Sequence, residues 1–500
     1  MSDQRLTDPS LSSGDVCPAD GWILSERPEN PEEACGVFGV YASNEDVARL
    51  TYFGLHALQH RGQESAGIAV ADGHTLMVVK NLGLVPQVFT EGDLDSLQGH
   101  LAVGHTRYST TGSGKKWENA QPMISSIGPN TIALGHNGNL VNTASLREEL
   151  HALGVRFRST TDSEVMVRLV DHFTQVHNSI RGGIRDAMQM MRGAYSVVMM
   201  SEEALYAFRD PHGVRPLVLG QLNAGRRGWV IASETCALDI VGAEYLRDVA
   251  PGELIRIKDG ELESEQAVPP GAPSMCLFEF VYFARPDSVL SDCSVYESRR
   301  LQGMALAKVL PVDADLIIGV PDSGIPGAVG YARASRLPYG EGLVKNRYVG
   351  RTFISPTQSL RQQGIRLKLN PLRHIIDGKR LVVVDDSIVR GNTSKQLVQL
   401  LRDAGAAEIH LRLTSPPVVW PCFYGIDTDT QEQLIASSHS VEETRAFIGA
   451  DSLAYLPLEN LVASTGRPAG EFCRACFDGE YPIEVPESVR RGKLALEPNA

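Results

Sequence analysis

Two adjacent carboxylates, Asp385 and Asp386, follow the apolar run Leu381–Val384 and precede a glycine-containing turn that leads into a helix ending near Gly405. Carboxylates at the end of a strand can accept hydrogen bonds from a ribose diol. The N–H groups and hydroxyls of the turn and of the helix N-terminus can bind a phosphate. An aspartate pair alone would fit a charged surface turn, but the whole loop predicts a phosphosugar site.

Cys35 is a second candidate, and by itself it would be interpreted as a buried packing residue. Its downstream companions change that interpretation to a candidate nucleophile. Four polar segments follow it in order: His60-Arg-Gly-Gln-Glu-Ser-Ala-Gly67, Gly104-His-Thr-Arg-Tyr-Ser109, Gly135-His-Asn-Gly138 and Thr161-Asp-Ser-Glu164. His105 and His136 flank these motifs, and we expect structural hydrogen bonds for both.

Four further cysteines form a candidate ligand set, namely Cys276, Cys422 and the Cys-x-x-Cys pair Cys473 and Cys476. Their spacing alone does not separate a structural zinc ion from an iron–sulfur cluster. Eight cysteines in 500 residues are too few and too scattered for a disulfide framework. The cysteines that match no motif are interpreted as ordinary residues: Cys17, Cys236 and Cys293.

The composition limits the class of protein. A chain of 500 residues, with 43% apolar and 21% charged residues, is expected to be globular and to contain at least two domains. A net charge of −13 repels phosphate backbones, so nucleic acid is not an expected partner. No apolar run is long enough to predict a membrane span, and the acidic segment Met1–Ala34 does not resemble a signal peptide, so we expect a cytoplasmic protein.

The elements that must position these residues differ between the two halves of the chain. From Cys35 to about Lys258, apolar runs separated by turn residues predict a mixed α+β segment. Capping boxes predict helices that begin with Ser145-Leu-Arg-Glu148 and with Thr161-Asp-Ser-Glu164. The strands are expected at Val37–Tyr41, Gly67–Ala71, Leu101–Gly104, Thr131–Gly135, Ser196–Met200 and Val230–Ala232.

The pattern of apolar residues changes after Gln266–Ser274. Proline and glycine interrupt the helical and strand periodicity there, which predicts a domain boundary. From Leu316 to Ser415, apolar strands alternate with helices, which predicts a parallel βαβ arrangement. Because ligands bind at the carboxyl ends of such strands, the loops after Val320 and Val384 are the expected sites. The predicted elements are Leu316–Val320, Gly324–Ala334, Leu381–Val384, Thr393–Ala404 and Ile409–Leu413.

The loop Asp385–Ser394, with Pro321-Asp-Ser-Gly324 and Lys345–Phe353, resembles the type I phosphoribosyltransferase domain of amidophosphoribosyltransferases, from about Cys276 to Pro482. The resemblance implies an α/β domain with a parallel sheet. It implies that Asp385, Asp386 and Ser323 surround Mg²⁺, a hard cation that prefers oxygen ligands. It further implies that the ribose 5-phosphate is held by Arg390, Gly391, Asn392, Thr393 and Ser394, and that a closing loop carries Arg347 and Arg351. Taken alone, either of these two arginines would be a surface charge.

The segments that follow Cys35 resemble the glutaminase domain of class II amidotransferases, an α+β N-terminal nucleophile (Ntn) hydrolase, as far as about Ile257. The resemblance implies that Cys35 begins the mature chain and that Met1–Ala34 is a removed propeptide. The free α-amine of Cys35, with a reference pKa of about 7.7–8.0, could then act as the base.

The same resemblance assigns roles around Cys35. Asn137 and the Gly138 N–H would stabilise the oxyanion, and one such donor is typically worth roughly 3–4 kcal/mol of barrier. Arg107 would bind the α-carboxylate of glutamine and Asp162 its ammonium. A plain surface ion pair is the alternative interpretation of Arg107.

One branch of the amidophosphoribosyltransferases carries a leader peptide together with cysteines at the positions of Cys276, Cys422, Cys473 and Cys476. This implies a structural [4Fe–4S] cluster. The expected organisation is a propeptide (1–34), a glutaminase domain (35–265), a phosphoribosyltransferase domain (275–482) and a C-terminal tail (483–500).

The expected reaction joins the two domains. Glutamine would supply ammonia, which displaces pyrophosphate from phosphoribosyl pyrophosphate to give 5-phosphoribosylamine, the start of purine synthesis. The family implies a homotetramer or other homo-oligomer that purine nucleotides inhibit. A class II enzyme that aminates fructose 6-phosphate or aspartate would lack Val384–Ser394, and a purine-sensing repressor would lack the Cys35 domain and carry a basic DNA-binding segment.

Overall fold

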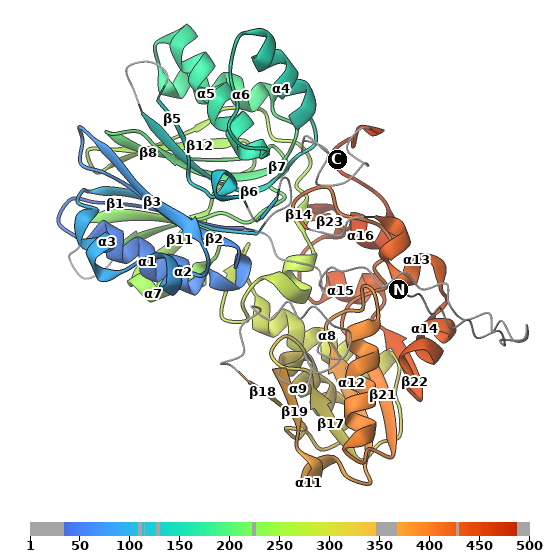
Figure 1. Cartoon of the computed structure of the whole chain (residues 1–500). Helices are drawn as coiled ribbons and strands as arrows, with labels where there is room; N and C mark the ends of the chain where they lie inside the picture. Colours follow the sequence, from blue (N-terminus) through green and yellow to red (C-terminus); the bar gives the residue numbers. More distant parts are fainter. Residues whose placement is uncertain are drawn as a thin grey trace, which may run out of the picture.

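A computed structural model describes residues 35–108, 113–114, 116–126, 131–222, 227–346, 368–426 and 430–487. The predictions for the leader (1–34), for Arg347 and Arg351, and for residues 488–500 of the tail lie outside these ranges. The described chain forms two lobes: the first contains the blue-to-green part of the chain and the second the yellow-to-red part (Figure 1). No helix within the described ranges is long and apolar enough to cross a membrane.

The first lobe contains two antiparallel sheets. The seven-stranded sheet has the order β11-β9-β10-β1-β4-β2-β3. Its strands are β1 (Gly36–Ala42), β2 (Ser65–Ala71), β3 (Leu76–Leu82), β4 (Leu101–Arg107), β9 (Val218–Leu222), β10 (Gly228–Ala232) and β11 (Ala243–Asp248). The six-stranded sheet, of order β13-β12-β8-β7-β6-β5, consists of β5 (Met123–Ser125), β6 (Ile132–Leu140), β7 (Gly193–Met200), β8 (Ala204–Arg209), β12 (Glu253–Lys258) and β13 (Glu261–Gln266).

Helices cover the outer faces of both sheets, so the first lobe has four layers (Figure 1). The seven-stranded sheet carries α1 (Val47–Ala57), α2 (Val85–Val88), α3 (Glu91–Ser96) and α7 (Thr235–Val241). The six-stranded sheet carries α4 (Thr143–Ala152), α5 (Asp162–His177) and α6 (Ile180–Met190). Two short turns of 3₁₀ helix are η1 (Gln59–Arg61) and η2 (Trp117–Asn119).

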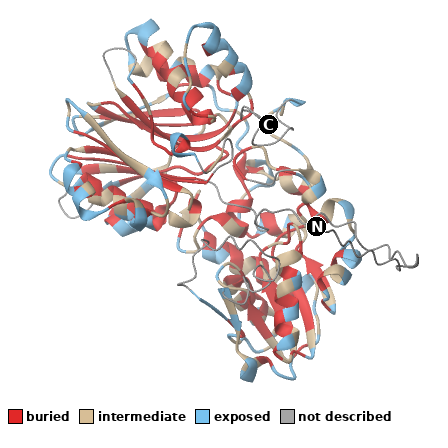
Figure 2. Ribbon diagram, viewed as in Figure 1, coloured by how far each residue is buried: buried red, intermediate tan, exposed pale blue. Residues whose placement is uncertain are grey.

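Strand β1 shows why this arrangement suits the sequence. Successive side chains of a strand point to opposite faces. Val37 and Tyr41 therefore belong to the core between the sheets, whereas Phe38 and Val40 belong to the core beneath the helices. Both faces are buried, which explains the continuous apolar run and the red strands of Figure 2.

The second lobe is built on a parallel sheet of order β17-β20-β21-β22. Its strands are β17 (Leu316–Gly319), β20 (Arg380–Asp385), β21 (Glu408–Leu413) and β22 (Ser452–Tyr455). The longer helices are α8 (Val295–Val309), α9 (Gly324–Ser335), α12 (Asn392–Asp403) and α14 (Val441–Ile448). Because β17 and β20 are neighbours, the loops that follow them meet at one edge of the sheet.

Shorter elements complete the second lobe and its junction with the first. The short helices are η3, a π-helix (Glu279–Phe283), α11 (Arg373–Ile376), η4 (Gln431–Gln433), α13 (Ile435–Ser438), α15 (Leu458–Ala463), η5 (Ala469–Glu471) and α16 (Ala475–Asp478). The short strands are β14 (Met275–Cys276), β15 (Val289–Leu290), β16 (Cys293–Ser294), β18 (Leu343–Lys345), β19 (Leu369–Pro371) and β23 (Phe472–Cys473).

Every strand and helix that we predicted from apolar runs is present, but the capping details differ. Helix α4 begins at Thr143 with Asn142 as N-cap, so the predicted start at Ser145 is wrong. The hydroxyl of Ser145 instead donates to Glu149 one turn later. Thr161 does cap α5 by accepting from the N–H of Glu164. The Glu164 carboxylate accepts from the N–H groups of Arg158 and Ser159, an arrangement that no local motif specifies.

Candidate active sites

Cys35 directly precedes β1, and pairing of β1 with β4 places it beside the end of β4. Gly36 lies opposite Thr106, and the Cys35 thiol donates to the carbonyl oxygen of Tyr108 over 3.2 Å. The side chain is buried. Because β1 begins at the next residue, the strand holds the backbone nitrogen of Cys35 in place. This nitrogen would become the N-terminal amine after loss of the leader.

Four charged side chains act on the Cys35 thiol. Burial raises the pKa of this thiol to about 12, and Arg107 and Arg215 only partly oppose that effect. Glu64 and Asp162 raise the pKa further. At neutral pH the thiol of the uncleaved chain is therefore protonated, and it needs a base before it can act as a nucleophile.

Asn137 and Gly138 lie on β6, which reaches the Cys35 region through β4. The ring of His105 on β4 contacts the carbonyl oxygen of His136 at 2.9 Å, and His105 is fully buried. The amide oxygen and nitrogen of Asn137 are also fully buried, and within the described ranges neither has a hydrogen-bond partner. A buried polar group without a partner lowers the stability of the folded protein by about 1–3 kcal/mol. The Asn137 amide is therefore available to donate to a ligand.

Gly138 has a positive φ of 140°, and a Cβ built there would lie 2.0 Å from the carbonyl oxygen of Ala194. Only glycine fits this position. The two histidines of these motifs make the structural hydrogen bonds that we predicted: His105 bonds to the His136 backbone, and the His136 ring contacts Ser163 Oγ at 3.3 Å. Burial lowers the pKa of His105 to about 3, so this ring is neutral.

Arg107 and Asp162 are both buried, and a surface ion pair is therefore a wrong description of Arg107. Arg107 Nη1 lies 3.4 Å from Glu64 Oε2 and donates to the carbonyl oxygen of Ser113 over 3.4 Å. Asp162 Oδ2 accepts from the N–H of Leu140 over 3.1 Å. A buried cation and a buried anion thus both lie close enough to Cys35 to influence its thiol, as binding of an α-amino acid would require.

The second site lies where β17 and β20 end. The Ser323 hydroxyl, before α9, donates to the Asp386 carboxylate, and Ser387 Oγ donates to Asp386 Oδ1 over 2.7 Å. Gly324 allows this approach, because a Cβ there would lie 2.4 Å from the carbonyl oxygen of Val384. Sequence motifs more than sixty residues apart therefore meet at one hydrogen-bonded cluster.

The phosphate-binding residues that we predicted occupy the start of α12. Gly391 is the N-cap, with a positive φ of 86°. Asn392, Thr393 and Ser394 form the first turn, and Arg390 directly precedes the cap. This geometry directs backbone N–H groups towards the loop that contains the carboxylates, as an anion site at a helix N-terminus requires.

Asp385 and Asp386 are two adjacent carboxylates, of which Asp386 is buried and Asp385 is half-buried. Burial raises the pKa of Asp385 well above its ordinary value, and the charge of Asp386 adds to this effect. Burial also raises the pKa of Asp386, although Ser323, Ser387 and Arg299 oppose it. A divalent cation with oxygen ligands would relieve this repulsion. Within the described ranges, however, no three His, Cys, Asp or Glu side chains are arranged around one metal ion.

Four cysteines gather at the junction of the two lobes. The parallel pairing of β14 with β23 places Cys276 opposite Cys473, and the N–H of Leu277 donates to the Cys473 carbonyl over 3.1 Å. The Cys476 carbonyl accepts from the N–H groups of Val419 and Trp420 over 3.0 and 3.1 Å, which holds the segment that leads to Cys422. Burial raises the pKa of Cys476 well above its ordinary value, and the other three cysteines raise it further. The four cysteines therefore act electrostatically on one another, but within the described ranges no three of them are arranged to hold a metal ion.

Comparison with known proteins supports the two-site description. Residues 105–239 match the model of a glutamine amidotransferase domain, and residues 305–414 match that of a phosphoribosyl transferase domain. An amidophosphoribosyltransferase of Synechococcus elongatus is 56% identical over 473 residues, which cover 94% of this chain and 96% of the relative. The chain belongs to the amidophosphoribosyltransferase family.

Other amidophosphoribosyltransferases agree over nearly the whole chain. The Bacillus subtilis relative is 47% identical over 458 residues, covering 91% of this chain and 95% of its own. A solved structure described as the allosteric regulatory enzyme of purine biosynthesis superimposes with a TM-score of 0.87 at 46% identity, covering 92% of this chain and 99% of the other. The predicted fold class, an Ntn glutaminase domain followed by a phosphoribosyltransferase domain, is confirmed.

Membership of the amidophosphoribosyltransferase family establishes the reaction that we predicted. The enzyme transfers the amide nitrogen of glutamine to phosphoribosyl pyrophosphate in purine biosynthesis. The alternatives, an enzyme that aminates fructose 6-phosphate or aspartate and a purine-sensing repressor, are therefore wrong. The comparisons do not test the individual site residues, the metal ligands or the domain boundaries, which stay predictions.

Sequence reasoning overlooked several groups of these amidophosphoribosyltransferase sites. Glu64 was part of a quoted motif, but its contact with Arg107 was not predicted. Tyr108 also stood in a quoted motif, but the hydrogen bond of its carbonyl with the Cys35 thiol was not predicted. Arg215, whose guanidinium acts on Cys35, stood in no quoted motif. In the second site, Lys345 Nζ lies 2.5 Å from Asp322 Oδ2. Both residues stood in quoted motifs, so only their pairing was missed.

Proposed function

We propose that the mature enzyme begins at Cys35 and that the free α-amine of this residue activates its own thiol. The thiolate attacks the side-chain amide carbon of glutamine, and the C–N bond breaks to release ammonia and leave a thioester. Water then hydrolyses the thioester to glutamate and regenerates the thiol. The observation that carries this proposal is the fully buried amide of Asn137, which has no hydrogen-bond partner within the described ranges.

The roles of the surrounding residues follow from their charges. Asn137 Nδ2 and the Gly138 N–H would donate to the tetrahedral oxyanion, and one such donor is typically worth roughly 3–4 kcal/mol of barrier. Arg107 would form a bidentate pair with the α-carboxylate of glutamine, and Asp162 would accept from its ammonium group. Both are buried, so these contacts would be made largely without water and would be correspondingly strong.

At the second site, the α12 N-terminus from Gly391 to Ser394 would bind the 5-phosphate, while Asp385 and Asp386 would bind the ribose hydroxyls. Ammonia then attacks C1 of the ribose, the C–O bond to pyrophosphate breaks, and a proton leaves to give 5-phosphoribosylamine. Mg²⁺, held by Asp385, Asp386 and Ser323, would supply positive charge to the leaving pyrophosphate. The paired carboxylates with raised pKa fit that cation. Arg347 and Arg351 are proposed to close over the substrate.

Removal of residues 1–34 should switch the glutaminase on, and this tests the proposed function. With the leader attached, the Cys35 nitrogen is an amide and cannot act as a base. After cleavage, the amine must be neutral to accept a proton, so activity should be lost as the pH falls through its pKa of about 7.7–8.0. We expect N-terminal sequencing of active enzyme to begin at Cys35, and a glutaminase pH profile that rises through this range.

The matched comparison is the uncleaved chain, purified under conditions that prevent processing. It should bind phosphoribosyl pyrophosphate and use ammonia, but it should lack glutaminase activity. Full glutaminase activity in a preparation whose only N-terminus is Met1 would contradict the assignment of the α-amine as base.

We also propose that Cys276, Cys422, Cys473 and Cys476 hold a [4Fe–4S] cluster that stabilises the junction of the lobes. The pairing of β14 with β23 places Cys276 opposite Cys473, and the other three cysteines raise the pKa of Cys476, so a cluster here would join these segments. Protein purified without oxygen should be brown and contain iron and sulfide. Cys473→Ser should remove both and lower the melting temperature.

Cys293→Ser is the control for this prediction, because Cys293 is a partly exposed cysteine of the same lobe that matches no ligand motif. It should leave iron content and stability unchanged. Colourless protein that contains zinc in place of iron would contradict the cluster, and so would an equal iron content in Cys473→Ser and Cys293→Ser.

We further propose that purine nucleotides regulate the enzyme, as the family implies. The proposal is supported by the solved Bacillus subtilis amidotransferase, which is described as complexed with ADP and GMP. That structure is 46% identical, has a TM-score of 0.85, and covers 91% of this chain and 100% of its own. The homo-oligomeric state and the cytoplasmic location stay predictions.

A further inference from the structure

Glu279 lies at the junction of the two lobes and is fully buried. It begins the π-helix η3, in which the N–H of Ala284 donates to the Glu279 carbonyl over 3.1 Å. Its carboxylate is held by two buried arginines of the first lobe. Arg61 Nη2 donates to Glu279 Oε2 over 2.6 Å, and Arg215 Nη2 donates to Glu279 Oε1 over 2.5 Å.

A second carboxylate balances the charge of these arginines. Glu234, also fully buried, accepts from Arg61 Nε with one oxygen. Its other oxygen accepts from the N–H of Arg285 over 2.9 Å and from Ser288 Oγ over 2.6 Å. Arg61, Arg215, Glu234 and Glu279 therefore form a charge-balanced set, here called the interlobe ion network.

The network contacts the glutamine site through Arg61 and Arg215. Gly62 follows Arg61, and a Cβ on Gly62 would lie 2.6 Å from the N atom of Arg107, so the two backbones are in close contact. Burial raises the pKa of the Cys35 thiol, and Arg215 is one of the two arginines that oppose this effect. A shift of Arg61 or Arg215 would therefore change both the backbone and the electrostatic field around Cys35.

The π-helix also connects Glu279 to the phosphoribosyl site. The wide turn leaves carbonyl groups available, and Arg299 of α8 donates to those of Phe280 and Ala284 over 3.0 and 2.7 Å. Helix α8 packs closely against α9, since a Cβ on Gly303 would lie 1.8 Å from the carbonyl oxygen of Gly327, and Ser323 before α9 donates to the Asp386 carboxylate. Arg299 thus bonds η3 to helix α8, which packs against α9 of the second site.

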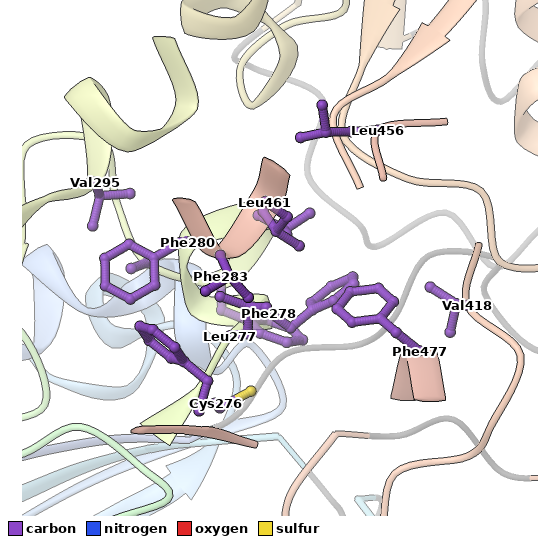
Figure 3. Close-up of a cluster of buried hydrophobic side chains, with 14 of the residues drawn as sticks. Cys276, Leu277, Phe278, Phe280, Phe283, Val295, Val418, Leu456, Leu461 and Phe477 are labelled. Atoms are coloured by element: carbon purple, nitrogen blue, oxygen red, sulfur yellow. The ribbon is translucent and has the colours of Figure 1, made fainter. Parts of the chain in front are cut away.

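The apolar surroundings of η3 prevent it from moving independently. Phe278, Phe280 and Phe283 are buried and pack in one cluster with Leu277 and Leu461 (Figure 3). The guanidinium of Arg215 also lies over the ring of Phe283, 5.7 Å from its centre. A close-packed core is hard to compress, so a displacement of η3 would be transmitted to the residues packed around it.

We propose that Glu279 is a positioning residue shared by both active sites, which fixes the glutamine loop through Arg61 and the phosphoribosyl site through η3 and Arg299. This inference rests on the proposed two-site reaction. Loss of the Glu279 charge leaves two buried arginines with one carboxylate, and breaking such a set is strongly destabilising locally. The expected consequence is that glutamine hydrolysis is no longer matched to phosphoribosylamine formation, so ammonia is released without being used.

Glu279→Gln tests the proposal, because it keeps the size and one acceptor oxygen but removes the charge. Glutamate release and phosphoribosylamine formation are measured in the same sample, and the ammonia-dependent rate is measured separately. We expect glutamine-dependent synthesis to fall by about a hundredfold, as for a misplaced reacting group. We expect the ammonia-dependent rate to fall much less, because the Glu279 carboxylate bonds directly to the arginines of the glutamine site and reaches the phosphoribosyl site only through the backbone of η3. The ratio of glutamate to phosphoribosylamine should rise.

Glu253→Gln is the matched control, since Glu253 is another buried glutamate of the first lobe that pairs with an arginine, at 2.7 Å from Arg247. It should lower stability without changing the ratio. If Glu279→Gln does not fold, Glu279→Asp keeps the charge at a shorter reach, and it should raise the same ratio by a smaller factor.

A second measurement compares the change in KM for phosphoribosyl pyrophosphate with the change in kcat. Arg299→Lys keeps the positive charge but loses the planar fork that bonds to η3, so it should raise the KM for phosphoribosyl pyrophosphate more than it lowers kcat. An unchanged ratio in folded Glu279→Gln, or an equal loss of the glutamine and ammonia reactions, would overturn the inference. Wild-type enzyme without either activity would contradict the proposed function instead.

Discussion

Cys35→Ala should abolish glutamine-dependent synthesis and leave ammonia-dependent synthesis intact. Loss of a covalent nucleophile can lower kcat by about 10⁶-fold. Ammonia needs no thiolate, because the second site only orients it towards the ribose and binds the leaving pyrophosphate. The phosphoribosyl site lies in the other lobe, so its geometry should not change.

The measurement compares initial rates with glutamine and with high concentrations of an ammonium salt on the same preparation. The ammonia-dependent rate serves as the internal control for folding. A Cys35→Ala enzyme that keeps its glutamine-dependent rate would contradict the nucleophile assignment. A folded variant that is inactive with ammonia as well would contradict the separation of the two sites.

Asp385→Asn and Asp386→Asn should greatly weaken binding of phosphoribosyl pyrophosphate while glutamine hydrolysis continues. Each substitution removes a charge for Mg²⁺ and an acceptor for the ribose hydroxyls. A hydrogen bond to a charged group is typically worth about 1.5–3 kcal/mol, which corresponds to roughly 10–100-fold in affinity. We therefore expect the KM for phosphoribosyl pyrophosphate to rise by about this factor or more in each variant.

The pH dependence of this KM follows from the two carboxyl groups. Burial raises the pKa of both, so protonation begins at a higher pH than for an ordinary aspartate. The protonated forms bind a cation poorly, and the KM should increase as the pH falls. Asp403→Asn, at the exposed end of the same α12 helix, should have an unchanged KM. Wild-type synthesis at subsaturating phosphoribosyl pyrophosphate in both site variants would contradict the assignment.

The sequence by itself determined those parts of the protein whose groups lie close together along the chain. The phosphoribosyl loop could be predicted because its strand, its aspartates and its helix N-terminus occupy one run, Leu381–Ser394. Apolar runs located β1, β6, β7 and the parallel strands, since a strand buried on both faces has few polar residues. Thr161 located the start of α5 for the same local reason.

Only the tertiary structure decided which distant groups meet. Arg61 and Glu279 are 218 residues apart, and Arg215 and Glu279 are 64 residues apart. Nothing in their local sequences distinguishes them from surface charges. Strand pairing and burial determine these contacts. A charged group that is removed from water is costly unless it is paired, and its partner can come from any part of the chain that the fold brings close.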